Sequence, residues 1–529
     1  MNRINILDCT LRDGGYINEF HFGESVIKDI VCKLTKASIE IIECGFLKSG
    51  AFDKDKSLFG SIESVKNIIG EKNPNLMYVA MIQYGGISNN EISDCKGDSI
   101  DGIRLTFHEH EIEPAFVLGK QLMDKGYKVF MQPVGTMTYT DKELLALIEQ
   151  INTLKPFAFY MVDTLGTMYS TDLRRMFYLV DNNLEKNIVL GFHSHNNLQL
   201  SFANAQELMQ MSTTRTLIID SSVYGMGRGA GNLNTELVTQ YINTNIGLRY
   251  DNLEVLEIID EYIKPLSLQY MWGYDVAYYI ASITGCHPNY ATYLINKQTL
   301  HTQGIYAILN SLEMDKRPLF DKRYIVEQYK NYMNHYVDDE MVQLKVKKLI
   351  GNKKVLLIAP GKSIVNNTDR INHLIETREY FTISVNFVPK EFKIDTAFVS
   401  NMKRFQGIQN LQTSVSDTTS ILITSNIVVD ENANISVLDY SSYLNEDTCI
   451  VDNAGLMCIN FMKKIGVKEI VLAGFDGFST VAKDNYFETA LYLSVEEENA
   501  INMNLAIEKK MEQLKTNIKI TYLTDSKYE

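Results

Sequence analysis

Two histidines, His193 and His195, stand one residue apart directly after the apolar run 188–190. In a β-strand alternate side chains point to the same face, so this spacing would bring both imidazoles to one point. Imidazole nitrogens are frequent ligands of divalent metal ions. Histidines that are only hydrogen-bonded in a protein core explain the pair equally well, so the interpretation depends on what other strand ends bring to the same place.

Oxygen donors stand near the ends of other apolar runs. Asp13 follows the first run and offers a carboxylate, and Asn232 follows the glycine-rich segment 225–231 and offers an amide oxygen. Oxygen and nitrogen ligands without a thiolate favour Mg²⁺ or Mn²⁺ over structural zinc, and they leave positions open for a chelating substrate. We therefore predict a divalent metal site formed by Asp13, His193, His195 and Asn232.

A second group of residues could stabilise negative charge or bind a substrate at such a site. Arg12 precedes the aspartate, and its guanidinium can stabilise an enolate oxygen without losing its own charge near neutral pH. Glu43 follows a neighbouring run and can orient Arg12 through a bidentate ion pair. Asp163 could contact a substrate or could equally cap the helix that follows it. The polar residues at strand ends that we expect to bind a substrate are Arg104, Gln132, Asp163 and Thr164.

These residues converge only if the runs that carry them form one sheet. In the first 225 residues short apolar runs alternate with longer amphipathic stretches, and the predicted strands are 4–8, 39–43, 77–82, 102–105, 128–132, 158–162, 188–193 and 217–223. Helical patterns cover 25–37, 111–125, 141–154 and 198–211. Eight strands, each followed by a helix, predict a TIM (β/α)₈ barrel, whose active site lies at the carboxyl ends of the strands. A doubly wound sheet would usually begin with a glycine-rich turn, whereas this first turn reads Arg-Asp-Gly-Gly.

The rest of the chain divides into two parts. After a barrel at 1–245, residues 246–348 show helical patterns and predict a helical extension over or beside the barrel. Its aromatic residues either pack between helices or form a lid over the barrel mouth. Residues 353–529 predict a second α/β domain with an open, mainly parallel, Rossmann-like sheet. Its predicted strands are 355–358, 382–386, 396–400, 421–424, 448–451, 469–473 and 518–522.

The bulk composition excludes several classes of protein. The net charge of −14 over 529 residues argues against a nucleic-acid-binding surface. No apolar run has the length of a membrane span, and the first residues do not read as a signal peptide. The seven cysteines are scattered without a CxxC pair. We therefore expect a cytoplasmic protein with reduced thiols.

The strand-end residues together resemble the DRE-TIM metallolyases, a family that includes 4-hydroxy-2-oxovalerate aldolase, hydroxymethylglutaryl-CoA lyase, and isopropylmalate and homocitrate synthases. The resemblance covers roughly residues 1–300 and rests on 10–14, Glu43, 193–196 and 225–232. It implies a metal-dependent aldolase, a carbon–carbon lyase that acts on a pyruvate-type 2-oxo acid and an aldehyde. The resemblance implies that Asp13, His193 and His195 hold Mn²⁺ or Mg²⁺ and that Asn232 lies in or beside the metal shell. It also implies that Arg12, with Glu43 as its partner, stabilises the enolate. We also expect a homo-oligomer.

Two departures from the family pattern narrow this expectation. The glycine-rich segment lacks the catalytic cysteine of hydroxymethylglutaryl-CoA lyase, which argues against that activity. Tyr16 stands where the hydroxy-oxovalerate aldolases carry a basic histidine. The candidate bases are then Tyr16, His21, Tyr290 and a metal-bound water. Two alternatives stay open: a Claisen-type acyltransferase that uses acetyl-CoA and a 2-oxo acid, and a catalytically inactive binding protein.

The second domain resembles the nucleotide-sugar-binding fold of bacterial sialyltransferases that use a CMP-sugar. The motifs that carry this resemblance are 360–363, 385–387, 453–461 and 466–477. It implies a site for a nucleotide or nucleotide sugar at Gly361, Ser363, Asn386 and Asp476, and a role of the fused chain in surface-polysaccharide sugar biosynthesis. Those enzymes use a late histidine as a base, whereas the last histidine here is His373. The domain could therefore bind such a ligand without transferring it, and a plain strand–helix turn also explains Gly361 and Ser363.

Overall fold

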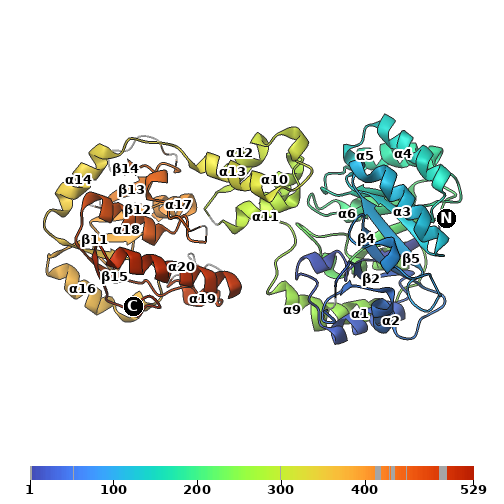
Figure 1. Cartoon of the computed structure of the whole chain (residues 1–529), viewed down its shortest axis with the longest axis horizontal. Coiled ribbons are helices and arrows are strands. Elements are labelled where there is room, and N and C mark those ends of the chain that lie inside the picture. Colours follow the sequence, from blue (N-terminus) through green and yellow to red (C-terminus); the bar gives the residue numbers. More distant parts are fainter. Residues whose placement is uncertain are drawn as a thin grey trace. The chain divides into compact units, whose positions relative to one another are not determined.

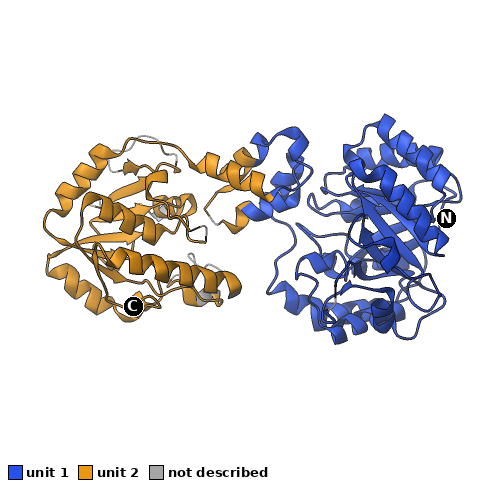
Figure 2. Cartoon of the chain, in the orientation of Figure 1, with its two compact units in different colours: residues 1–293, 309–321 blue, residues 294–308, 322–529 orange. Residues whose placement is uncertain are grey.

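The computed structural model describes residues 3–51, 53–297, 299–411, 419–427, 429, 435–447, 449–487 and 497–529. The chain forms two compact units (Figures 1 and 2). Unit 1 comprises residues 1–293 and 309–321, and unit 2 comprises residues 294–308 and 322–529. The helical stretch that we predicted as one extension at 246–348 is thus divided between the two units.

Unit 1 is a closed parallel barrel surrounded by helices. Its strands are β1 (Ile4–Asp8), β2 (Ile41–Leu47), β3 (Leu58–Phe59), β4 (Met77–Gln83), β5 (Gly102–Phe107), β6 (Lys128–Pro133), β7 (Ala158–Asp163), β8 (Val189–Ser194) and β9 (Leu217–Ser221). The order β1-β9-β8-β7-β6-β5-β4-β2 is closed by pairing of β1 with β2, and β3 adds a short outer strand to β2. The predicted TIM barrel is confirmed.

The helices of unit 1 cover the outside of the barrel. They are α1 (Glu24–Lys36), α2 (Ile62–Ile69), α3 (Ile112–Asp124), α4 (Asp141–Leu154), α5 (Ser170–Asn183), α6 (Ser201–Gln210), α7 (Thr235–Asn245), α8 (Asn252–Ile258), α9 (Lys264–Ser267), α10 (Val276–Ile283) and most of α11 (Pro288–Asn296). Their boundaries follow local chemistry: α4 begins after Thr140, which forms a reciprocal capping box with Glu143. Helices between the strands, such as α2 and α5, bury apolar residues, and strands such as β2 and β7 are buried along their whole length.

Unit 2 is built on an open parallel sheet. Its strands are β10 (Lys354–Ile358), β11 (Tyr380–Val385), β12 (Thr396–Val399), β13 (Ser420–Thr424), β14 (Ile435–Leu438), β15 (Glu469–Ala473) and β16 (Lys519–Tyr522). Their order is β14-β13-β12-β11-β10-β15-β16, so the direction of winding reverses between β10 and β15. The predicted open-sheet domain is confirmed. The predicted strand at 448–451 is wrong over its described residues 449–451, which form a turn before the next helix, and the edge strand β14 was not predicted.

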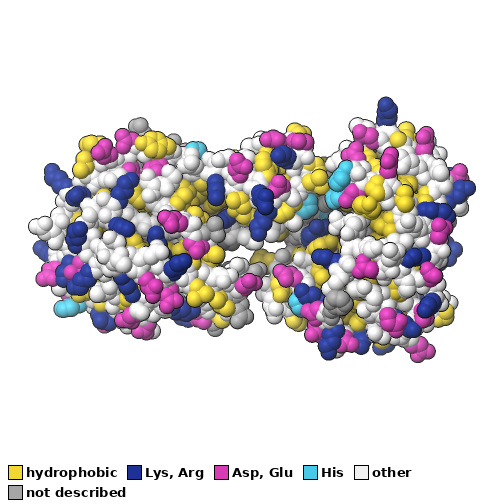
Figure 3. Space-filling view, in the orientation of Figure 1, with side chains coloured by type: hydrophobic (Ala, Val, Ile, Leu, Met, Phe, Trp, Pro, Cys, Tyr) yellow, Lys and Arg dark blue, Asp and Glu magenta, His cyan; other side chains and the backbone are white. Residues whose placement is uncertain are grey.

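The remaining helices belong wholly or mostly to unit 2 and continue the chain from unit 1. They are α12 (Thr302–Ser311), α13 (Lys322–Met333), α14 (Glu340–Ile350), α15 (Ser363–Asn366), α16 (Thr368–Glu376), α17 (Met402–Leu411), α18 (Ala454–Ile465), α19 (Ala482–Asn485) and α20 (Glu497–Lys515). Among the described residues, none of the helices combines the length and the apolar character needed to span a membrane. Side chains of both charge signs are interspersed over the face of the molecule in Figure 3.

Candidate active site

The predicted metal ligands come together at the carboxyl ends of β1 and β8. Asp13 lies in the turn after β1, where its backbone N–H donates to the carbonyl of Cys9 at 2.8 Å. Its Oδ2 lies 3.5 Å from Nε2 of His193 and 3.6 Å from Nε2 of His195. Burial opposes ionisation of Asp13, but Arg12 and the two histidines hold its pKa well below the usual value. The carboxylate is therefore ionised and available to a cation.

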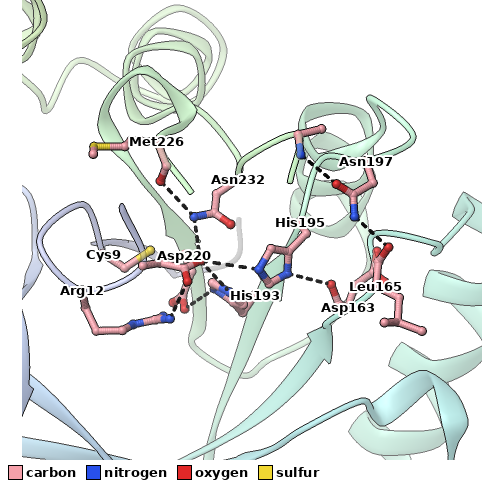
Figure 4. Close-up of polar contacts among 12 residues, drawn as sticks. Cys9, Arg12, Asp163, Leu165, His193, His195, Asn197, Asp220, Met226 and Asn232 are labelled. Carbon is pink, nitrogen blue, oxygen red and sulfur yellow. Dashed lines mark hydrogen bonds and ion pairs between the residues drawn. The ribbon is translucent and has the colours of Figure 1, made fainter. Parts of the chain in front are cut away.

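The imidazoles are held so that one nitrogen of each stays open. His193 donates from Nδ1 to Oδ2 of Asp220 at 3.0 Å, and His195 donates from Nδ1 to the backbone oxygen of Asp163 at 3.1 Å (Figure 4). Because both partners are acceptors, each ring in its neutral form carries its lone pair on the Nε2 atom that faces Asp13. Burial lowers the pKa of His195 to about 3, so that this ring is neutral at pH 7.

Asn232 completes the group with an oxygen that lacks a partner. Its Nδ2 donates to Oδ2 of Asp13 at 2.7 Å and to the carbonyl of Met226 at 3.2 Å. Its Oδ1 is buried and has no hydrogen-bond partner among the described residues. A buried oxygen is rarely left unpaired, and this one lies beside a carboxylate and two imidazoles. The donor set therefore fits a divalent cation.

Cys9 is a neighbour of this group that the sequence did not suggest. Its sulfur, an oxygen of Asp13 and a nitrogen of His193 lie within 4.8 Å of one another. The thiol donates to the backbone oxygen of Ser221 at 3.2 Å, and burial raises its pKa well above the usual value. A protonated thiol is a poor metal ligand, so the oxygen and nitrogen donors carry the site.

Arg12 is fixed beside the predicted metal ligands but keeps one N–H group unpaired. Its Nε donates to Oε2 of Glu43 at 2.9 Å, and its Nη1 lies 3.0 Å from Oδ1 of Asp13. Its Nη2 is buried without a hydrogen-bond partner in the described structure. The pairing with Glu43 is present, but it is not bidentate, because Oε1 of Glu43 has no hydrogen-bond partner among the described residues. Oε2 of Glu43 also accepts from Nη1 of Arg104 at 2.6 Å.

Arg104 does not reach a position where a substrate could contact it, contrary to our prediction. It is fully buried, where it pairs with Glu43 and Asp220 and lies over the ring of Tyr160 at 5.1 Å. Asp220, at the end of β9, was missed by sequence reasoning, and the signal was a lone aspartate in an otherwise apolar strand. Arg104 therefore bridges Glu43 and Asp220. These two carboxylates are in turn the hydrogen-bond partners of Arg12 and His193.

A cavity of about 320 Å³ opens above these residues. Gln132 and Thr164 line it, so their predicted contact with a substrate stays a prediction. Asp163 does not line it: its carboxylate accepts from the backbone N–H groups of Thr167 at 2.9 Å and Met168 at 3.1 Å. Asp163 is therefore a cap of the turn that follows β7, and it orients His195 through its backbone oxygen.

The three candidate bases lie in different surroundings. Tyr16 lines the cavity. His21 lies outside it, half-exposed and 3.4 Å from Asp53, and the hydroxyl of Tyr290 donates to the backbone oxygens of Lys316 and Leu319. Neither His21 nor Tyr290 lines the cavity, so a role of either residue as the base stays a prediction. Two cavity-lining histidines, His108 and His287, were not predicted. Segments 287–289 and 318–320 contribute to the lining, so part of the helical stretch does cover the barrel mouth.

A second cavity, of about 230 Å³, lies in unit 2 at the carboxyl ends of β10, β11, β12 and β15. Gly361, Asn386 and Asp476 line it, as expected of a binding site. Ser363 does not, because its N–H and hydroxyl donate to the carboxylate of Asp476 at 2.7 Å and 2.5 Å. A role of Ser363 in contacting a nucleotide is not supported by this position.

Comparisons with known proteins match part of the chain. The HMGL-like family model matches residues 119–260. Oxaloacetate decarboxylase from Mycobacterium tuberculosis is 29% identical over 239 residues, which cover 44% of this chain and 67% of the relative. 4-Hydroxy-2-oxovalerate aldolase from Geobacillus genomosp. 3 is 26% identical over 271 residues, which cover 50% of this chain and 77% of the relative.

Among solved structures, the HMG-CoA lyase from Brucella melitensis aligns with a TM-score of 0.42 at 14% identity, over 50% of this chain and 99% of the lyase. These matches give no support to the sialyltransferase resemblance of unit 2, which stays a prediction. The family-model match and the two relatives show that the barrel of this chain is similar to the HMGL-like, DRE-TIM proteins.

Proposed function

We propose that unit 1 is a divalent-metal-dependent lyase that breaks or forms a carbon–carbon bond through the enolate of pyruvate. The observation that carries the proposal is Nη2 of Arg12, a buried N–H group that has no hydrogen-bond partner among the described residues and belongs to a residue that lines the cavity. Glu43 and Asp13 hold the rest of the guanidinium, so this donor is fixed before a substrate arrives. A fixed, unpaired donor in a buried site is suited to an oxygen on which negative charge develops.

The donor set of Asp13, His193, His195 and Asn232 would hold Mn²⁺ or Mg²⁺. Such an ion, when bound, supplies a Lewis acid for the oxygens of a 2-oxo acid. The residues behind the ligands keep the set in place: Asp220 orients His193, and the backbone oxygen of Asp163 orients His195. Partners of this kind fix the tautomer of each ligand.

In the aldol cleavage a base takes the proton of the 4-hydroxyl group of a 4-hydroxy-2-oxo acid. The C3–C4 bond then breaks, its electron pair enters the enolate beside Arg12, the aldehyde departs, and C3 takes up a proton. Loss of CO₂ from oxaloacetate reaches the same enolate without that base. The two named relatives, an aldolase and an oxaloacetate decarboxylase, therefore share the step that Arg12 would assist.

Tyr16 is the candidate base, since it is the predicted one that lines the cavity. His287, by contrast, is suited to donating a hydrogen bond into the cavity, which it also lines. Its Nδ1 accepts from the backbone N–H of Asn289 at 3.1 Å, and burial lowers its pKa to about 3. The neutral ring must then carry its proton on Nε2.

Product analysis separates the reaction classes. The full-length protein, loaded with Mn²⁺, is incubated with oxaloacetate, with 4-hydroxy-2-oxovalerate, with pyruvate plus aldehydes, or with a 2-oxo acid plus acetyl-CoA, and products are identified by mass spectrometry. Formation of pyruvate or of an aldol product supports the proposal. Release of CoA thiol would instead indicate the Claisen-type alternative, and a metal-loaded protein that turns over none of these mixtures would be a binding protein.

We also propose that unit 2 binds a nucleotide or nucleotide sugar, which would suit a chain that serves surface-polysaccharide sugar biosynthesis. The observation that favours it is the position of the second cavity, at the reversal of winding between β10 and β15, where open parallel sheets commonly bind ligands. The first residues of α18 line this cavity together with Lys297 and Arg404. A helix N-terminus with two cations favours a phosphate group.

Calorimetric titration of the full-length protein with CMP, UMP, AMP and inorganic phosphate tests this second proposal. Binding of a nucleotide that weakens about tenfold in Arg404→Gln is expected, because a charged hydrogen bond is lost. Lys519→Gln, which removes an exposed cation of the sheet edge, is the control. Absence of binding by all four ligands at millimolar concentration would overturn the proposal.

A further inference from the structure

The cavity of unit 1 is lined by residues whose chemistry the metal site and Arg12 do not use. Its lining contains two arginines, Arg12 and Arg228, and four histidines, but no aspartate or glutamate. Arg12 is already paired with Glu43 and Asp13. Arg228 forms no ion pair with any described residue, and its recorded contact is with the ring of Tyr16, 4.3 Å from the guanidinium carbon to the ring centre.

Hydrogen bonds and close packing hold the backbone of the loop that carries Arg228. The backbone oxygen of Arg228 accepts from the N–H of Gly231 at 3.0 Å, and Ala230 donates to the side chain of Asn197 at 2.9 Å. Gly231 has a φ of +83°, and a Cβ there would lie 2.1 Å from the oxygen of Gly225. A side chain would not fit at position 231, so this turn of the loop requires glycine.

The surroundings of Arg228 are polar on the cavity side. Gln83, His108 and Asn289 line the cavity with it, and Phe320 adds an apolar wall. His287, which also lines it, carries its proton on Nε2 for the reason given above. A cation without a carboxylate partner, among donors of hydrogen bonds, is suited to an anionic group of a ligand.

We propose that Arg228 is a specificity-determining residue that binds an anionic group, a carboxylate or a phosphate, at the far end of the aldehyde substrate. The inference rests on the proposed lyase function. The 2-oxo acid occupies the inner end of the cavity at Arg12, and the aldehyde lies between it and Arg228. The stacking of Arg228 on Tyr16 places this anion-binding group next to the candidate base, so that binding of the charged end would also order that base.

The experiment compares aldehydes that differ in charge. The Mn²⁺-loaded, full-length protein is given pyruvate with glyceraldehyde 3-phosphate or glyceraldehyde, and with succinic semialdehyde or butanal. In the wild type we expect kcat/KM to be about 10–100-fold higher for at least one charged aldehyde than for its neutral counterpart, the size expected for one charged hydrogen-bonded pair. The phosphate and carboxylate pairs reveal which anion is bound.

Variants then assign the preference to Arg228. Arg228→Gln is expected to remove most of the charged-to-neutral ratio, and Arg228→Lys to keep part of it, because a lysine retains the charge but not the planar geometry. Arg174→Gln is the matched control, since Arg174 is exposed and pairs with Glu207 on the outer helices. No charge preference in the wild type, or a preference that survives in Arg228→Gln, would overturn the inference.

Exchange of the pyruvate methyl protons with D₂O keeps this inference separate from the lyase proposal. Exchange by the wild type with failure to react with any charged aldehyde would overturn the role of Arg228 and leave the lyase proposal intact. Absence of both exchange and all turnover would overturn the lyase proposal itself. A larger loss of pyruvate affinity than of the charged-to-neutral ratio in Arg228→Gln would assign Arg228 to the pyruvate carboxylate and also overturn the inference.

Discussion

The two cavities of this chain are built in different ways. In unit 1 the inner end is formed by side chains at strand ends, and buried ion pairs through Glu43, Arg104 and Asp220 join them into one network. In unit 2 the cavity is lined mainly by loops and by the start of α18. Two carboxylates, Asp452 and Asp476, line it, and Asp476 is already paired with Ser363. The first arrangement holds charges in fixed positions for chemistry, and the second leaves backbone groups and small residues around a space for a ligand.

The largest effect is expected at Arg12. Arg12→Ala removes the unpaired donor at the reacting oxygen, and kcat of the reaction in unit 1 should fall about 10²–10³-fold, as for other fixed oxyanion donors. Mn²⁺ binding, followed by electron paramagnetic resonance, should persist because the four ligands remain. A kcat equal to that of the wild type in a folded, metal-loaded Arg12→Ala protein would contradict the role of this residue.

Asp220 tests whether the network behind the ligands matters. Asp220→Asn weakens the acceptor of the Nδ1 proton of His193, and metal affinity or activity should fall about 10–100-fold. Asp53→Asn, which changes an exposed carboxylate beside His21, is the control. Equal Mn²⁺ affinities of the two variants in a competition titration would show that the network does not support the metal site.

Sequence patterns predicted the barrel, its eight strands and the convergence of Asp13, His193 and His195, because the carboxyl ends of barrel strands must meet. They did not predict the partners behind these residues. In the sequence Arg104 is a polar residue at a predicted strand end. Only the structure shows that its guanidinium forms ion pairs with Glu43 and Asp220. Contacts between residues far apart in the chain, such as that of His287 with the barrel cavity, likewise have no local signal.

The stability of the folded protein should fall at acidic pH because of His287, which lines the cavity of unit 1. The pKa of His287 is lowered by burial to about 3, so the folded protein keeps this ring neutral while the unfolded chain binds a proton below about pH 6.5. Stability contributed by the neutral ring is therefore present above that pH and is lost as the pH falls. His287→Gln should thus gain about 1.4 kcal/mol relative to the wild type between pH 7.5 and 5.5 in denaturant unfolding. If the free energy of unfolding of His287→Gln differs from that of the wild type by the same amount at both pH values, the ring is accessible to protons in the folded protein.

The smallest effect is expected at Ser363 in unit 2. Because its hydroxyl bonds to Asp476 and does not line the cavity, Ser363→Ala should cost about 1 kcal/mol of stability in thermal unfolding. Its effect on nucleotide affinity should be smaller than the effect of Arg404→Gln. A loss of affinity in Ser363→Ala larger than that in Arg404→Gln would place the ligand against Ser363 and reverse the assignment of that cavity.

The most direct test of the central claim is proton exchange at the methyl group of pyruvate. The Mn²⁺-loaded protein is incubated with pyruvate in D₂O, and the methyl signal is followed by nuclear magnetic resonance. We expect the signal to decay with the wild type, to persist after chelation of the metal, and to persist with Arg12→Ala. A folded wild-type protein with Mn²⁺ bound that leaves the methyl signal intact would contradict enolate chemistry in this barrel.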